Sequence, residues 1–206
     1  MDNLVELFGF PDKVKLLTKV TKKVVELGCG GSRKFNGSIT VDAVKLPGVD
    51  IIHDLNEGLP FADDSIDEIH SYHFLEHVND LQFVLTEIHR VLKKGGKNIG
   101  TVPHFSNPHF YSDFTHKNFF GLYTFAYFEN AQTTFRRKVP TFYSGNLSFQ
   151  TKKIDLVFKS SFIERYPIKK AIGAIFNSCR YMQELYEENF CFLFPAYEIY
   201  FEIEKI

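Results

Sequence analysis

Several features that would assign this chain to a specialised class are missing from its sequence. It has no Trp, only 3 Cys in 206 residues and a net charge of -1. Cys29, Cys179 and Cys191 are odd in number, lie far apart and form no CxxC pair, which argues against a disulfide framework or a zinc site. Because the charges balance, no overall field draws the protein onto nucleic acid, and nucleic acid is not an expected partner.

Long apolar runs and targeting signals are also missing. No stretch approaches the roughly 18 apolar residues of a membrane span, and the first residues lack a basic region followed by an apolar run. We therefore expect a reduced, cytoplasmic protein with no membrane span. The chain is 44% hydrophobic, and folding a domain of this length buries roughly 70% of the unfolded surface. A single domain over residues 1–206 is expected.

The first half of the chain reads as alternating strands and helices. Short apolar runs predict strands at residues 24–27, 38–44, 49–55, 66–73 and 97–102. Apolar residues at helical spacing predict a helix over 81–92, with Asn79 or Asp80 as its cap and Gly95-Gly96 as its end. Strand, helix and strand in this order predict a parallel sheet.

The second half is far more aromatic: 17 of the 23 Phe and 9 of the 10 Tyr follow residue 100. A short helix within 119–128, a strand over 147–158 with an irregularity at Lys152-Lys153, and one helix face from Ile172 to Tyr186 are expected. The final residues, 197–204, alternate strictly between apolar and polar side chains, which predicts a strand with one wet face. We expect it to close a sheet edge, antiparallel to the strand over 147–158.

A glycine cluster follows the first strand. Gly28 and Gly30 stand where this strand is expected to turn sharply towards a helix, so backbone N–H groups can approach a nucleotide-like ligand. A ligand-free structural turn is the alternative interpretation. The dinucleotide pattern G-x-G-x-x-G is interrupted by Arg33, which disfavours a nicotinamide oxidoreductase.

Five motifs in order resemble those of class I S-adenosylmethionine-dependent methyltransferases, in the small-molecule branch. They are Glu26-x-Gly28-x-Gly30, Asp42, Asp54-Leu55, the segment from Leu59 to Ile69 with His73-Phe74-Leu75-Glu76-His77, and Leu92-Lys93-Lys94-Gly95-Gly96. A departure is Ser32, where many members carry a third glycine. The resemblance covers about residues 20–105, and implies a cofactor-binding half there and an acceptor-side half over 105–206. It implies a Rossmann-like, doubly wound α/β sheet of about seven strands, mostly parallel with an antiparallel C-terminal strand.

The same resemblance implies S-adenosylmethionine as cofactor and gives roles to several residues. Asp42 is expected to hold the ribose hydroxyls, Asp54 and Leu55 to contact the adenine, and Glu26 to lie near the methionine end. His73 is expected to line the pocket beside Gly28 and Gly30. Each acidic residue has an alternative structural role, as a turn residue, a cap or a satisfied strand-end carboxylate, and His77 is expected to be structural.

The loop over 103–117 is expected to overhang the reacting methyl group, because ligands of open α/β sheets bind beyond the carboxyl ends of the strands. His116, oriented by Asp113, is the candidate general base. There are two alternatives: these side chains form hydrogen bonds to backbone groups of the loop, or they bind a metal ion. The spacing of His104, His109, Asp113 and His116 matches no standard site, and no metal is expected.

The aromatic residues of the second half have three functional interpretations beside ordinary core: an apolar acceptor pocket, a homodimer contact or a lipid-facing surface. Arg136-Arg137-Lys138 and Lys152-Lys153 can meet an anionic substrate or form a solvated face. The leading hypothesis is a methyltransferase acting on a small-molecule or glycan-like acceptor. The alternative is a non-catalytic subunit that keeps the cofactor and acts through a partner.

Overall fold

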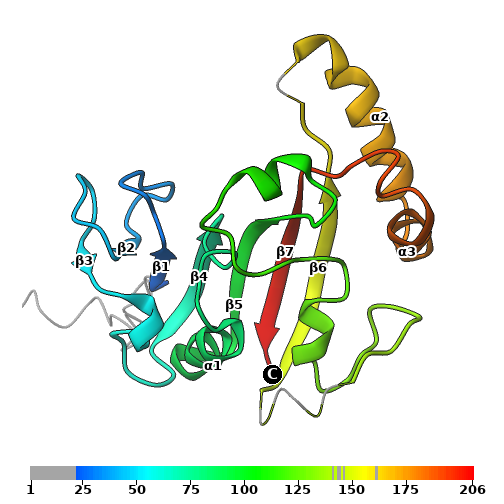
Figure 1. The fold of residues 1–206 in the computed structure, drawn as a ribbon. Helices are drawn as coiled ribbons and strands as arrows, with labels where there is room; N and C mark the ends of the chain where they lie inside the picture. Colours follow the sequence, from blue (N-terminus) through cyan, green and yellow to red (C-terminus); the bar gives the residue numbers. More distant parts are fainter. Residues whose placement is uncertain (1–21, 141, 143–144, 146, 161) are drawn as a thin grey trace, which may run out of the picture.

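The computed structural model describes residues 22–140, 142, 145, 147–160 and 162–206. Seven strands form one sheet in the order β3-β2-β1-β4-β5-β7-β6 (Figure 1). The strands are β1 Val24–Leu27, β2 Ile39–Asp42, β3 Ile51–Ile52, β4 Ile66–Tyr72, β5 Leu92–Pro103, β6 Phe149–Val157 and β7 Glu198–Lys205. Neighbours among β1 to β5 pair in parallel, whereas β7 is antiparallel to β5 and to β6. This is the predicted mostly parallel sheet with an antiparallel C-terminal strand.

The last strand does not close an edge, as its alternation had suggested. β7 lies between β5 and β6, and β6 forms the edge. The apolar side chains of β7 are buried at Ile199, Phe201 and Ile203, which suits an interior strand with one packed face. The predicted irregularity of β6 is confirmed, because its pairing with β7 shifts between Thr151 and Lys153.

The two faces of the sheet differ in chemistry. On one face, Val25 pairs with Ile69, and both are fully buried in the apolar core. The other face carries a row of laterally paired residues: Glu26, His70, Ile99, Glu202 and Lys153. Most of this row is polar, so among the described residues the apolar core lies on one side of the sheet.

Helix α1, Leu81–Val91, supplies part of that core. Asp80 caps it as expected, accepting a hydrogen bond from the backbone N–H of Phe83 at 2.9 Å. Its buried residues are Val84, Leu85, Ile88 and Val91. The expected end at Gly95-Gly96 is wrong: these glycines lie inside β5, where the pairing with β4 is irregular. Gly95 has a φ of +77°, which fits a local bulge better than regular strand.

The C-terminal helical face is split into two helices, α2 Tyr166–Phe176 and α3 Arg180–Asn189. Between them, the Asn177 side chain accepts from the N–H of Leu156 at 2.8 Å and donates to its C=O at 2.7 Å. These two hydrogen bonds pair the backbone of edge strand β6 with a side chain, and they place Asn177 between the two helices. Helical periodicity alone does not reveal this break.

Four short 3₁₀ helices complete the described elements: η1 Leu55–Glu57, η2 Pro108–Ser112, η3 Phe125–Phe128 and η4 Ile163–Arg165. The aromatic segment before β6 divides between core and surface, since Phe120 and Phe125 are buried whereas Phe119 is 61% exposed. The three cysteines are free. None of the described helices has both the length and the apolar character needed to cross a bilayer.

Candidate functional site

The turn after β1 depends on two glycines with left-handed backbone. Gly28 has a φ of +62°, and a Cβ there would lie 2.6 Å from Cδ2 of Phe74. Gly30 has a φ of +58° and open space around the position of a Cβ. Both positions therefore favour glycine, but Gly28 also needs it because the backbone passes directly against an aromatic ring.

The expected helix after this turn is missing. Residues 28–38, all of them described, form turns and bends. Only 11 residues connect β1 to β2, and Gly37 adds another left-handed position with a φ of +83°. A helix dipole therefore does not act at this turn, and side chains of the chain itself hold the loop.

Asp42 is one of those side chains. It stands at the end of β2, where one carboxylate oxygen accepts from the N–H of Gly30 at 2.9 Å and the other from the N–H of Val44 at 3.0 Å. A carboxylate oxygen has more than one lone pair, so both oxygens keep capacity to accept from a ligand. Asp42 fixes the glycine turn and still presents its charge to the cavity beside it.

That cavity has a volume of about 270 Å³. It gathers five of the seven residues that sequence reasoning assigned to the cofactor: Gly28, Asp42, Asp54, Leu55 and His73. Asn56, Phe74, His77 and Val78 are among the other lining residues. The ends of β1, β2 and β4 meet here, as expected for the carboxyl edge of a parallel sheet.

Glu26 lies beside this cavity rather than in its wall. Its buried carboxylate accepts from the N–H groups of Lys34 and Phe35, at 2.9 and 3.0 Å, and from the hydroxyl of Ser38. Burial acts to raise the pKa of Glu26, but these hydrogen bonds outweigh it and hold that pKa below its ordinary value. The geometry matches the structural alternative for Glu26, a carboxylate that anchors the loop over 28–38.

Replacing Glu26 with Gln should destabilise the protein by about 2 kcal/mol at pH 7, because hydrogen bonds to a charged acceptor are lost. A lowered pKa in the folded state gives stability that is complete above the ordinary value of 4.5 and is lost as the pH falls through the folded value. The difference between the two proteins should therefore shrink below about pH 4.5. Urea unfolding at several pH values measures it.

The exposed carboxylate of Glu57 provides the control. Glu57→Gln should change the unfolding free energy by less than about 0.5 kcal/mol. Equal effects of the two substitutions at pH 7 would contradict the anchoring role of Glu26.

Asp54 caps η1. Its Oδ1 accepts from the backbone N–H and side-chain amide of Asn56, at 2.9 and 2.8 Å, and these hydrogen bonds lower the pKa of Asp54. The capping alternative is thus present in the structure. Asp54 nevertheless lies in the cavity wall next to Leu55, so capping holds its carboxylate at the position from which it can accept from a ligand.

His73 directly follows β4 and has a strained backbone conformation with a φ of +52°. Its Nδ1 lies 3.2 Å from Glu76 and its Nε2 lies 2.9 Å from Glu198. Hydrogen bonds to Glu198 and Glu76 raise the pKa of His73 to about 9, so the ring is a cation at neutral pH. The ring belongs to the wall of this first cavity and also to that of a second one.

The second cavity, also about 270 Å³, lies under the loop that follows β5. It shares His73 and His77 with the first cavity. Its other lining residues are Glu76, Pro103, Asn107, His109, Phe110, Asp113, His116 and Tyr197. The loop is held over it because the N–H groups of Lys117 and Asn118 donate to the C=O of Glu76, at 2.7 and 3.1 Å.

The predicted pair of Asp113 and His116 faces this second cavity. Nε2 of His116 lies 3.5 Å from Oδ2 of Asp113, while Nδ1 lies 3.0 Å from the C=O of Phe110. A carbonyl only accepts, so Nδ1 carries a proton, and in the neutral ring Nε2 carries the lone pair. Hydrogen bonds from Thr115 lower the pKa of Asp113, which keeps a negative charge beside the nitrogen that can take a proton.

His77 was expected to be structural, but it lies in the walls of both cavities. Its Nδ1 lies 2.9 Å from the hydroxyl of Thr115, which donates to Asp113 at 2.6 Å. The ring of His77 meets that of His116 edge to face, with centroids 4.9 Å apart. The motif that contains Glu76 and His77 was the only sequence signal for a role of His77 in the site. The contact of His77 with Thr115 could not be predicted, because the two lie 38 residues apart along the chain.

The loop histidines separate into two groups. His104 is fully buried, with Nδ1 2.7 Å from the Ser106 hydroxyl and Nε2 3.3 Å from Glu187. Both ring nitrogens of His104 therefore have partners within the protein, which matches the structural alternative given for the loop side chains. His104 does not line the second cavity. His109 is exposed and lines that cavity. The four-residue metal set considered from sequence is therefore not brought together.

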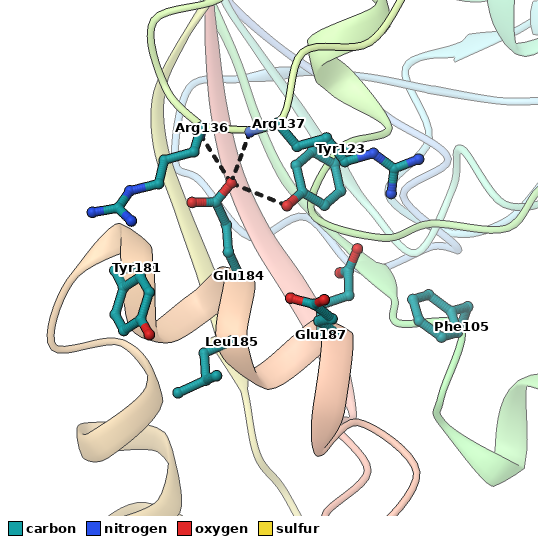
Figure 2. A pocket seen from close by; sticks show the side chains of 9 residues that line it. Phe105, Tyr123, Arg136, Arg137, Tyr181, Glu184, Leu185 and Glu187 are labelled. Atoms are coloured by element: carbon teal, nitrogen blue, oxygen red, sulfur yellow. Dashed lines mark hydrogen bonds between the residues drawn. The ribbon is translucent and has the colours of Figure 1, made fainter.

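A larger cavity of about 630 Å³ lies elsewhere, against α3 (Figure 2). One oxygen of Glu184 accepts from the N–H groups of Arg136 and Arg137, at 2.9 and 3.3 Å, and from the hydroxyl of Tyr123 at 3.0 Å. The guanidinium of Arg136 lies 4.9 Å from the ring centre of Tyr181. Its lining includes Tyr123, Arg136 and Arg137, from the segments considered for an acceptor pocket or an anionic substrate, but none of the residues predicted to bind the cofactor or to act as the base.

Comparison with known proteins gives a local match in sequence and a broader one in fold. Residues 33–99 match the family model described as a methyltransferase domain. No curated protein matches the chain in sequence.

Solved structures extend the likeness beyond that segment. An S-adenosylmethionine-dependent methyltransferase from Mesorhizobium loti has a TM-score of 0.53 at 15% identity, over 89% of this chain and 90% of that chain. One from Archaeoglobus fulgidus has a TM-score of 0.55 at 19% identity, over 91% and 87%. A putative methyltransferase of Haloferax volcanii, solved with the activator Trm112, has a TM-score of 0.52 at 13% identity, over 89% and 82%. At these identities the likeness is one of fold.

Proposed function

We propose, on the premise that this chain carries a domain of the class I S-adenosylmethionine-dependent methyltransferase family, that it transfers a methyl group to a small-molecule or glycan-like acceptor. The fold and the matched segment imply S-adenosylmethionine as the cofactor. The observation that supports the reaction is the pair of adjoining cavities, which share His73 and His77. One has the chemistry of a cofactor pocket and the other that of an acceptor pocket.

The first cavity fits the cofactor in two ways. The close approach of Gly28 to Phe74 requires a residue without a Cβ, so the backbone of the turn stays bare and a ligand can come close to it. Asp42 offers a carboxylate with capacity for two hydroxyl groups, and charge-assisted hydrogen bonds of this kind are strong. We assign Asp42 to the ribose, and Asp54 and Leu55 to the adenine. Gly28 and Gly30 form the turn whose backbone lies against the cofactor.

When bound, S-adenosylmethionine supplies a methyl group on a positively charged sulfur. The chain has to hold the acceptor in line with that group, exclude water and remove a proton. Asn107 and Tyr197 offer polar groups to the acceptor, and Phe110 an apolar wall. The cavity of about 270 Å³ suits a small polar molecule or one sugar unit of a larger one.

His116 is the proposed base. Its Nε2 lone pair accepts the proton of the attacking hydroxyl or amine, and the imidazolium that forms is stabilised by Asp113 at 3.5 Å. The Phe110 carbonyl holds the opposite nitrogen in the donor state, so the ring presents the correct tautomer before the acceptor arrives. Thr115 fixes Asp113 through two hydrogen bonds, at 2.6 and 2.9 Å.

Calorimetric titration of the purified chain with S-adenosylmethionine and, separately, with NAD tests the cofactor assignment. We expect micromolar binding of S-adenosylmethionine and none of NAD. Binding of neither compound would contradict the proposal, because the turn at Gly28 would then be a structural feature only.

Asp42→Ala should weaken S-adenosylmethionine binding by about 30-fold, which corresponds to the loss of roughly 2 kcal/mol of charged hydrogen bonding. Asp42→Asn keeps the shape and one acceptor oxygen, so it should weaken binding by about tenfold or less. The calorimetric Kd measures both. Unchanged affinity in folded Asp42→Ala protein would remove Asp42 from the cofactor site.

A further inference from the structure

Three side chains in the wall of the second cavity converge on one point. Glu76, His77 and His116 each offer one ligand atom, and these atoms lie within 4.8 Å of one another. They come from two separate parts of the chain, the segment after β4 and the loop after β5.

The hydrogen bonds of both histidines leave the same nitrogen available. In His116, Nδ1 donates to the carbonyl of Phe110 at 3.0 Å. In His77, Nδ1 lies 2.9 Å from the hydroxyl of Thr115, whose proton is already donated to Asp113 at 2.6 Å. That hydroxyl therefore accepts from His77, and both rings keep a free lone pair on Nε2. Histidines that bind metals have this arrangement, with the second nitrogen donating to an oxygen.

Glu76 provides an independent observation. Its side chain is 1% exposed, and Oε1 is engaged by His73 at 3.2 Å. Oε2 is buried and finds no hydrogen-bond partner among the residues that the structure describes. A buried carboxylate oxygen without a partner is costly, and a cation beside it would remove that cost.

We propose that Glu76, His77 and His116 form a binding site for a divalent transition-metal ion such as Zn²⁺. Two imidazoles and one carboxylate are a common ligand set for zinc, with a further position open to water or another ligand. Ligand atoms on one tetrahedral zinc lie roughly 3.3 Å apart, so the three side chains need to close by about 1.5 Å at most from their present separation of up to 4.8 Å.

The site has a consequence for activity, and this part rests on the proposed function. The lone pair of His116 cannot hold a metal ion and take a proton from the acceptor at the same time. The ion would also occupy the acceptor cavity but not the wall formed by Asp42 and Asp54. Zinc should therefore inhibit methyl transfer in competition with the acceptor and leave S-adenosylmethionine affinity unchanged.

Calorimetric titration of the full chain, free of a polyhistidine tag, with zinc chloride tests the site. We expect one ion per chain with a micromolar Kd. His77→Ala and His116→Ala should each weaken binding at least tenfold. His109→Ala is the matched control, because His109 lines the same cavity but is not one of the three proposed ligands. The zinc Kd of this variant should equal that of the native protein.

Ring ¹⁵N NMR adds a readout that does not depend on affinity or activity. Zinc should shift Nε2 of His77 and His116 while their Nδ1 signals remain those of N–H donors. A zinc Kd above about 100 μM would overturn the proposal. Equal zinc affinity in His77→Ala and the native protein would also overturn it. Circular dichroism verifies that each variant is folded.

The two proposals fail in different ways. If the chain does not bind S-adenosylmethionine but zinc still binds through His77 and His116, the metal site stands and the methyl-transfer function falls. If S-adenosylmethionine binds and zinc does not, the metal site falls alone. Zinc bound through His116 with unchanged turnover would overturn the inhibition and also the role of His116 as base.

Discussion

His116→Ala is expected to lower turnover by roughly 10²–10⁴-fold, the usual contribution of a positioned general base. The reason is the lone pair on Nε2, which the hydrogen bond from Nδ1 to Phe110 leaves free and which Asp113 faces at 3.5 Å. Methyl transfer from labelled S-adenosylmethionine to an acceptor selected from small hydroxyl and amine compounds measures the loss. The calorimetric Kd for S-adenosylmethionine should be unchanged, because His116 lines only the second cavity.

Asp113→Asn gives a graded companion to that variant. It keeps the hydrogen bonds to Thr115 but removes the charge that stabilises the imidazolium, so turnover should fall by about tenfold, and by less than in His116→Ala. Full turnover in His116→Ala would exclude His116 from the reaction. A larger loss in Asp113→Asn than in His116→Ala would show that Asp113 acts chiefly by holding the loop.

Gly28→Ala is expected to destabilise the protein by about 2–5 kcal/mol, which combines left-handed strain of about 1–2 kcal/mol with overpacking of about 1–3 kcal/mol. The new Cβ would lie 2.6 Å from Cδ2 of Phe74, and also within 3.0 Å of its Cβ and Cγ. Since both residues line the first cavity, to which we assign the cofactor, S-adenosylmethionine binding should also be lost. Urea unfolding measures the stability, and calorimetry the binding.

Gly30→Ala separates the two causes. Its φ of +58° is nearly that of Gly28, but nothing lies within 4 Å of the added Cβ. We expect a destabilisation of about 1–2 kcal/mol from backbone strain alone, with folded protein retained. Equal losses in the two variants would mean that the contact with Phe74 carries none of the cost.

The sequence by itself predicted the features that depend on neighbouring residues. The strand after Lys23, the cap at Asp80, the irregularity of β6 and the alternation of β7 follow from local periodicity and turn chemistry. The glycines at 28 and 30 were recognisable because their backbone conformation depends on the residue itself. The carboxyl edge of the parallel strands then predicted where Asp42 and Asp54 would meet.

Tertiary structure decided everything that joins distant segments. The alternation of β7 could not predict its position inside the sheet. An interior antiparallel strand with one packed face has the same alternation as an edge strand. The break at Asn177 depends on β6, whose unpaired backbone accepts the amide. The short connection after Gly30 forms no helix because the carboxylates of Glu26 and Asp42 take its amide groups.

The second cavity, which we propose for the acceptor, shows the same division most clearly. The sequence predicted Asp113 and His116 as a pair from their place after the fifth strand, but not that His77 and Glu76 lie beside them. These contacts arise because the loop folds back and its amides bind the carbonyl of Glu76, some 40 residues earlier. Spacing along a chain carries no information about which side chains such a fold brings within a few ångströms. The sequence therefore determined most of the elements and the edge of the sheet where the first cavity lies, whereas the packing of the loop on the segment after β4 determined the second cavity.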